Sequence, residues 1–91
     1  MSIGFEYDAK RNRLAVRGEL TILHAAEALA HFRDRPGLEL DLGEVTEMDG
    51  AGLQLLLATE RDGGLLVFAC GDAAAEVLHL AGRSDLMEAI S

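Results

Sequence analysis

The sequence is poor in the side chains that covalent catalysis uses. It has one cysteine, Cys70, and three serines, none of which lies in a Gly-x-Ser-x-Gly segment. A single cysteine excludes an internal disulfide, and its place in the apolar run 65–70 predicts a buried, unreactive thiol. The chain therefore offers no candidate catalytic nucleophile, and we predict that it is not an enzyme.

Motifs for metals and nucleotides are also missing. His24 and His31 are seven residues apart with no third ligand beside them, and His79 is far away in the sequence, so we interpret all three as solvent-facing. The ten glycines form neither a Gly-x-Gly-x-x-Gly turn nor a Gly-Lys-Ser/Thr segment. We therefore expect no metal site and no cofactor.

Positive charge is scarce as well. Eight lysines and arginines face 16 acidic residues, which gives a net charge of −8 and an isoelectric point near 4.6. Such a chain repels phosphate backbones, so nucleic acid is an improbable class of partner. No apolar run approaches the roughly 20 residues of a membrane span, and the first residues lack a basic segment followed by an apolar one. We expect a cytoplasmic protein without membrane insertion.

The apolar pattern predicts one α/β domain over residues 1–91, a length that supports a single core. Alternation of apolar and polar residues predicts a hairpin of strands at 3–7 and 13–17, and a third strand at 38–42. The continuous run 65–70 predicts a central strand covered on both faces.

Three helices are expected between and after these strands. The first, 22–33, has an apolar stripe formed by Ile22, Ala25, Ala26, Leu29 and Phe32. Thr21, Asp49 and Asp72 are suited to cap the three helices, and Gly82 to end the third in a left-handed turn. The element order ββαβαβα predicts a mixed sheet, four-stranded or with a fifth strand, with helices packed on it.

Several segments carry a resemblance to a known family. They are Arg17-Gly18-Glu19-Leu20-Thr21 after the second strand, Leu38-Glu39-Leu40-Asp41-Leu42 with Val45-Thr46-Glu47-Met48-Asp49-Gly50-Ala51-Gly52-Leu53 in the middle, and Leu78-His79-Leu80-Ala81-Gly82 near the end. Each is weak alone, but their order and spacing across nearly the whole chain resemble the STAS family, named for sulphate transporters and anti-sigma factor antagonists.

The resemblance implies a function in bacterial signalling and transcription regulation. Antagonists of this type bind a serine-kinase-type anti-sigma factor. That kinase phosphorylates a serine after the loop aspartate, and the phosphorylation breaks the complex. Gly50 stands at that position here and Ala51 follows it, so the resemblance implies a binding module without the usual phosphorylation switch. The alternative is a small STAS subunit of a lipid-transporting ABC importer, which would bind the transporter's ATPase.

The Asp49 loop is the candidate partner-binding site. Leu53, Leu56 and Leu57 can face the sheet, whereas Leu55 is expected to point away from them. An acidic rim would favour a basic partner; it consists of Glu44, Glu47, Asp49, Glu60 and Asp62. The proposed contact residues are Asp49, Gly50, Ala51, Gly52, Leu53 and Leu55. The alternative is purely structural, with Asp49 as a helix cap, two glycines that permit a tight turn, and a single exposed leucine.

Overall fold

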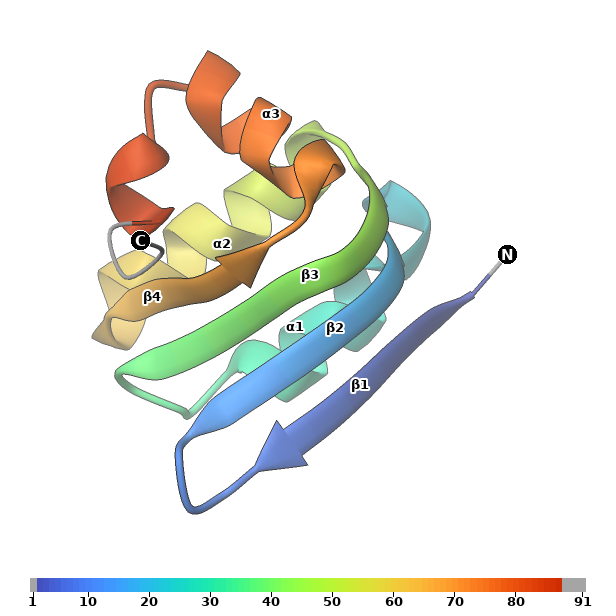
Figure 1. The fold of residues 1–91 in the computed structure, drawn as a ribbon. Coiled ribbons are helices and arrows are strands. Elements are labelled where there is room, and N and C mark those ends of the chain that lie inside the picture. The colour runs from blue at the N-terminus through green and yellow to red at the C-terminus, as the bar shows by residue number, and fades with distance from the viewer. Residues whose placement is uncertain (1, 88–91) are drawn as a thin grey trace.

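A mixed four-stranded sheet forms the centre of the molecule, as the sequence predicts (Figure 1). The computed structural model describes residues 2–87. The strands are β1 (Ile3–Asp8), β2 (Arg13–Leu20), β3 (Leu38–Met48) and β4 (Leu65–Cys70), in the spatial order β1-β2-β3-β4. β1 and β2 are antiparallel, whereas β2, β3 and β4 are parallel. The hairpin therefore comes first and the crossovers follow.

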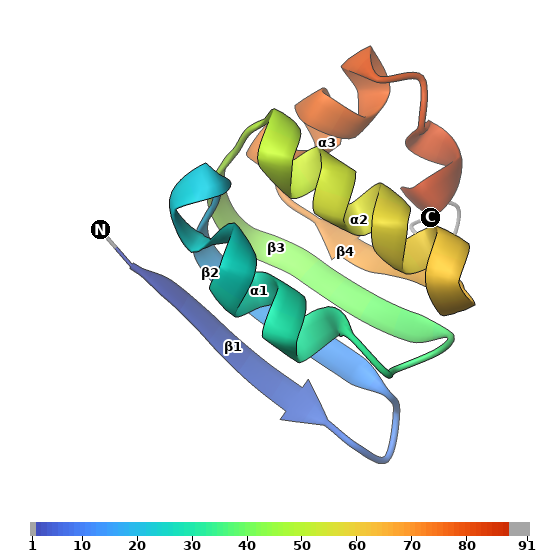
Figure 2. The ribbon, with the colours of Figure 1, turned by 180° about the vertical axis from the view of Figure 1, so that it is seen from behind.

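Helices provide the crossovers between the parallel strands. A 3₁₀ turn, η1 (Ile22–His24), precedes α1 (Ala25–Phe32), and α2 (Gly50–Gly63) follows β3. Figures 1 and 2 show α1 and α2 side by side on one face of the sheet. After β4, α3 (Asp72–Leu80) packs against β3, and the 3₁₀ turn η2 (Ser84–Met87) contacts β4. No helix among residues 2–87 is long and apolar enough to span a membrane.

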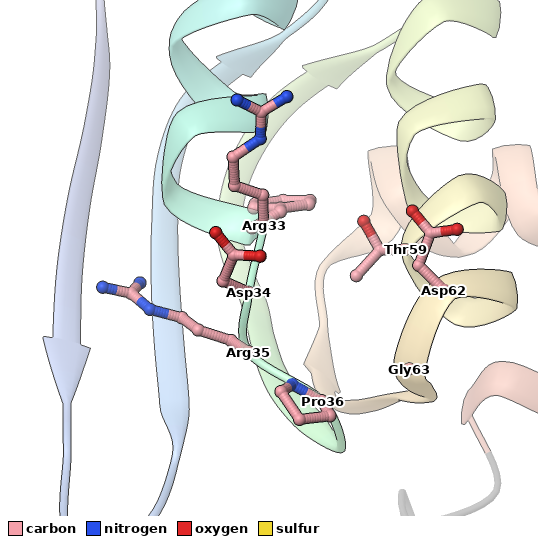
Figure 3. Close-up of a pocket in the computed structure, with 8 residues that line it drawn as sticks. Arg33, Asp34, Arg35, Pro36, Thr59, Asp62 and Gly63 are labelled. Carbon is pink, nitrogen blue, oxygen red and sulfur yellow. The ribbon is translucent and has the colours of Figure 1, made fainter.

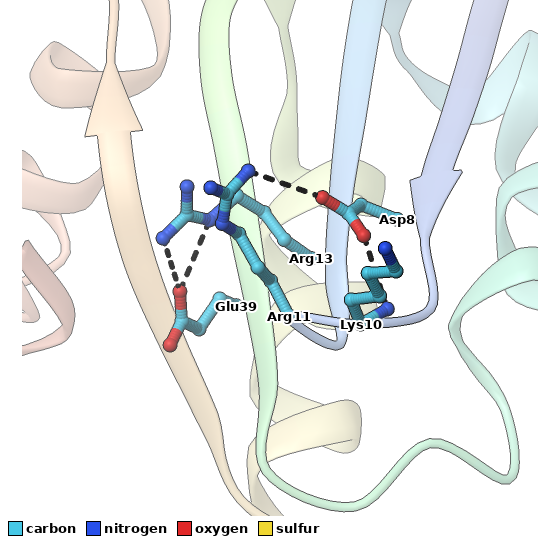
Figure 4. A network of polar contacts seen from close by, with 5 residues as sticks. All are labelled: Asp8, Lys10, Arg11, Arg13 and Glu39. Carbon is cyan, nitrogen blue, oxygen red and sulfur yellow. Dashed lines mark hydrogen bonds and ion pairs between the residues drawn. The ribbon is translucent and has the colours of Figure 1, made fainter.

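The core lies between the sheet and the helices. Leu14 and Val16 of β2, Leu40 of β3, Phe32 of α1 and Leu56 of α2 are each at most 1% exposed. The opposite face of the sheet carries charged side chains on β2 and β3, where Arg13 forms an ion pair with Glu39 at 2.8 Å (Figure 4). The sheet thus buries one face under α1 and α2, and its other face has charged residues on β2 and β3 and apolar residues on β4.

A second group of polar contacts fixes the turn between β1 and β2. The Lys10 backbone N–H donates to Asp8 at 3.0 Å, and Arg11 pairs with the same carboxylate at 3.3 Å (Figure 4). These contacts are exposed, so they fix the turn without contributing much to global stability.

The prediction that residues 65–70 form a central strand was wrong. β4 lies at an edge of the sheet, and Leu66 and Phe68 are 37% and 39% exposed on the uncovered face. The guanidinium of Arg13 lies 3.6 Å from the centre of the Phe68 ring and partly covers it. An unbroken apolar run does not distinguish a central strand covered on both faces from an edge strand whose outer face is partly covered by the Arg13 side chain from β2.

β3 continues to Met48, well past the predicted end at Leu42. Val45 and Met48 are buried, but they do not follow strict alternation, and the pairing with β2 shifts register twice. Such irregularities change which residues face the core, which is why the alternation ended in the sequence pattern while the strand did not.

Helix starts differ from prediction at two of three positions. Thr21 makes no side-chain capping bond, and its hydroxyl is buried without a partner in the described structure. Asp72 lies inside the first turn of α3, after Gly71, rather than at the cap. Asp49 caps α2 as predicted, and Gly82 adopts a left-handed φ of 72°. A polar residue near a predicted helix start therefore does not prove a cap. If the helix begins one residue earlier or later, the side chain no longer reaches the free backbone N–H groups.

The buried stripe of α1 also differs from the predicted one. Ala28 and Phe32 are buried, whereas Ile22 and Ala26 are exposed. The 3₁₀ turn η1 has about three residues per turn, and the backbone of His24 is not helical. An α-helical spacing counted from Ile22 therefore does not predict which residues of α1 are buried.

Candidate protein-binding site at the start of α2

Asp49 joins two segments that are far apart in the sequence. One carboxylate oxygen accepts a hydrogen bond from the Gly52 backbone N–H at 3.0 Å, and the other accepts one from the Ile22 backbone N–H at 3.0 Å. The first bond is the predicted helix cap. The second connects η1 to the first turn of α2. Asp49 therefore fixes the relative position of both segments.

These bonds stabilise the charged form of the carboxylate. The bond from Ile22 and then that from Gly52 lower the pKa of Asp49 below its ordinary value. Because its oxygens are turned toward backbone donors, Asp49 serves the loop's geometry more than it offers a free charge to a partner.

The two loop glycines have opposite surroundings. Gly50 is exposed, and a Cβ placed there would meet nothing within 4 Å. Gly52 is buried, and a Cβ placed there would collide with the backbone oxygen of Leu20. The first turn of α2 can therefore approach β2 closely only because residue 52 lacks a side chain.

The remaining predicted contact residues point mainly inward. Leu53 is partly buried against the core, and Ala51 is half-buried. The prediction that Leu55 faces solvent was wrong, since it is 8% exposed and belongs to the core. α2 packs against α1, β3, β4 and α3, so more than one narrow stripe of the helix is covered.

Ile22 and Leu23 are exposed apolar residues. The sequence pattern predicted Ile22 in the apolar stripe of the first helix, and it gave no prediction for Leu23. Their side chains are 68% and 80% exposed, on the η1 turn that Asp49 binds. No local signal separates this pair from Leu55 and Leu56 of α2, which are also consecutive but are both buried. The exposed residues of the site thus include Ile22 and Leu23 on η1 and Gly50 at the start of α2.

The predicted acidic rim is not one cluster. Glu44 pairs with Arg17 at 2.9 Å, and Glu60 pairs with Arg83 at 2.7 Å. Glu60 and Asp62 lie on the last turns of α2, a helix whose 14 residues span about 20 Å. Only Glu47 and Asp49 of the predicted rim remain near the loop without a lysine or arginine partner in the described part of the chain.

A cavity of about 350 Å³ lies at the opposite end of α2. Thr59 and Asp62 face the segment 33–36 across it, while Arg33 and Arg35 extend away from it (Figure 3). The Arg35 guanidinium instead stacks 3.6 Å from the Tyr7 ring centre. The cavity is therefore separate from the Asp49 loop.

The histidines are less exposed than predicted. The His31 ring stacks on Phe5 with centroids 4.0 Å apart, and His24 is 4.0 Å from the half-buried Glu19 carboxylate. Only His79 is exposed. Within residues 2–87, no group of three or more histidine, cysteine or acidic side chains is arranged to hold a metal. Cys70 is half-buried, not fully buried, and this burial raises its thiol pKa.

A hairpin-first mixed sheet and an aspartate-capped glycine loop at the start of α2 define a small α/β domain. The family model described as "Mlab, STAS domain" matches residues 3–88. The chain therefore belongs to this STAS family. A comparison with curated proteins finds no match.

Solved structures share the fold. An anti-sigma factor antagonist from Mycobacterium paratuberculosis superposes with a TM-score of 0.82 and 24% identity, over 96% of this chain and 84% of that one. The anti-sigma factor antagonist SpoIIAA in its unphosphorylated form gives a TM-score of 0.72 and 18% identity, over 94% of this chain and 85% of that one. The predicted fold class is confirmed.

Replacing the Asp49 carboxylate should weaken the fold at neutral pH. We expect Asp49→Ala to lower the free energy of unfolding by about 1 to 2 kcal/mol, because the Ile22 and Gly52 N–H groups lose their acceptor. Urea denaturation at pH 7 measures the change. An unchanged midpoint would show that neither hydrogen bond contributes to stability.

The same contribution should depend on pH. Because the folded pKa of Asp49 lies below its unfolded value of about 3.9, the stabilisation is present above that pH and disappears as the pH falls through the folded pKa. The stability gap between the wild type and Asp49→Ala should therefore narrow below about pH 4. A gap that stays constant down to the folded pKa would contradict the assignment.

Proposed function

We propose that the chain is a non-enzymatic protein-interaction module of the anti-sigma factor antagonist type, acting in bacterial signalling. Its partner in this proposal is a serine-kinase-type anti-sigma factor, whose surface the module occupies in the cytoplasm. The observation that carries the proposal is the start of α2, where the exposed Gly50 follows Asp49, and Asp49 binds the η1 turn that carries the exposed Ile22 and Leu23. Two solved structures with the same fold are anti-sigma factor antagonists, which supports this class of partner.

The binding experiment uses the purified chain and a purified serine-kinase-type anti-sigma factor from the same bacterium. Isothermal titration should detect binding of the chain to the kinase. If the kinase already holds a sigma factor, binding of the chain should displace that sigma factor. The ATPase subunit of an ABC transporter is the comparison partner. Binding to that ATPase with no binding to the kinase would contradict the signalling role and favour a subunit of a lipid importer.

Gly50 stands in this proposal where related antagonists carry the phosphorylated serine. A side chain at position 50 has free space, and a phosphate at a helix N-terminus is stabilised by unpaired N–H groups and the helix dipole. With the kinase and ATP, the wild type should take up no phosphate at this loop, whereas Gly50→Ser should be phosphorylated and should lose its affinity for the kinase. Mass spectrometry locates the phosphate.

Ala51→Ser is the matched control for that experiment. Residue 51 is half-buried, so a serine there should be a poor substrate compared with serine at the exposed position 50. Stoichiometric phosphate on Thr46, Thr59 or Ser84 of the wild type, with weakened binding, would contradict the proposal of a module without a phosphorylation switch.

A further inference from the structure

Ile22 and Leu23 are exposed, and their side chains contribute nothing to the core of the domain. Both are large, consecutive and apolar, and neither belongs to the core of the described structure. Removing a large apolar side chain from water is favourable, so a partner that covers both residues gains binding free energy. Single exposed leucines are common on protein surfaces, but an adjacent pair on one turn forms a small apolar projection.

The turn that carries them is held in place. The Ile22 N–H donates to Asp49 at 3.0 Å, and the His24 N–H donates to the Thr21 carbonyl at 3.0 Å. On the other side of Asp49, Gly52 packs against the Leu20 carbonyl with no room for a side chain. η1 and the start of α2 therefore form one unit (Figure 2). A projection fixed in this way loses little conformational entropy on binding.

The surroundings of the projection are acidic. Glu47 is exposed on β3 and pairs with no lysine or arginine within residues 2–87, whereas the side chain of its register partner Glu19 on β2 is only 14% exposed. Glu27 lies in the first turn of α1, and Asp49 lies beneath the turn. His24, on the same turn, lies 4.0 Å from the Glu19 carboxylate. An apolar projection with an acidic rim is complementary to an apolar pocket with a basic rim.

From these observations we infer that Ile22 and Leu23 are the apolar anchor of the partner complex, buried in a pocket of the partner protein that is rimmed by lysine and arginine. Asp49 is a positioning residue that holds the anchor against the start of α2. This inference rests on the proposed function and deepens it, because it moves the main binding contribution from α2 to η1. An anionic membrane is disfavoured as the occupant by the acidic rim.

The test measures affinity for the purified serine-kinase-type anti-sigma factor and for the ABC ATPase by isothermal titration. Leu23→Ser and Ile22→Ser should each weaken binding by about 10-fold or more, as expected for residues at the centre of an interface. Leu80→Ser is the matched control, since Leu80 is 76% exposed on the last turn of α3, and it should change the affinity less than about twofold.

Asp49→Ser separates the positioning role from helix capping. Serine is a good N-cap and can still accept from Gly52, but its shorter side chain does not reach Ile22. The expected result is a smaller loss of stability than in Asp49→Ala, faster hydrogen exchange at the Ile22 amide and affinity reduced by about fivefold. Unchanged exchange at Ile22, or unchanged affinity, would overturn the positioning role.

The salt dependence of the affinity tests the acidic residues around Ile22 and Leu23. Affinity should fall as NaCl rises from about 0.05 M to about 0.5 M, and Glu47→Gln should flatten that dependence. A salt-independent affinity would overturn the basic rim of the partner pocket.

The outcomes distinguish the inference from the proposed function. If the wild type binds the kinase and Leu23→Ser binds equally well, the anchor is overturned while the function stands. If it binds only the ATPase and Leu23→Ser weakens that complex, the function is overturned while the anchor stands. Binding to neither protein overturns both. Binding to vesicles of phosphatidylcholine and phosphatidylglycerol that Leu23→Ser abolishes would replace the protein partner by lipid and overturn the inference.

Discussion

Gly52→Ala should destabilise the protein by about 2 to 3 kcal/mol, the cost of forcing extra atoms into a closely packed position. The added methyl group would collide with the Leu20 carbonyl and would also lie 3.2 Å from the Met48 side chain. A backbone carbonyl cannot rotate away as a flexible side chain can, so the start of α2 must move away from β2. Chemical denaturation of the variant measures the loss.

Gly50→Ala is the control for this substitution, two residues earlier in the same loop. A Cβ at residue 50 meets no atom within 4 Å, and alanine has a higher helix propensity than glycine. The free energy of unfolding of this variant should therefore be unchanged or higher by up to about 1 kcal/mol. Equal losses for the two variants would show that the collision at Leu20 is not the cause. The comparison also bears on function, because moving α2 would stretch the Asp49 bond to Ile22.

Leu55→Ala should lower the free energy of unfolding by about 2 to 4 kcal/mol, as for other buried leucines. Leu55 is 8% exposed and packs in the core, so truncation removes apolar contacts and leaves space that the surrounding helices fill only in part. Thermal and urea denaturation should both report the loss.

Leu80→Ala supplies the comparison, because Leu80 is 76% exposed and its truncation should change stability by less than about 0.5 kcal/mol. If instead Leu55→Ala kept full stability but lost affinity for the kinase, Leu55 would lie on the partner surface, as its sequence position first indicated. The two leucines therefore distinguish a core role from a docking role.

Burial of Leu55 changes how the candidate site is understood. Of the six contact residues expected from the sequence, Gly52 and Leu55 are buried and Asp49 directs its carboxylate to backbone donors. The surface that remains for a partner is small at α2 itself. This is why the exposed pair on η1, adjacent through Asp49, becomes the main candidate for apolar contact.

The amino-acid sequence by itself determined the element order and the capped loop. Alternating runs indicated the hairpin and the start of β3, and Asp49 was identified as the cap of α2, because strand alternation and capping depend on residues close together in the chain. The element order ββαβαβα predicted the mixed sheet. These features are local, so a single sequence contains them.

Only the tertiary structure decided which side chains face outward. The phase of α1 was shifted by the 3₁₀ turn, β4 became an edge strand, and Leu55 was covered because α2 has neighbours on several sides. The bond from Ile22 to Asp49 joins residues 27 positions apart, and no local pattern indicates it. Exposure and long-range hydrogen bonds depend on which distant segments meet, and that is set when the whole core packs together.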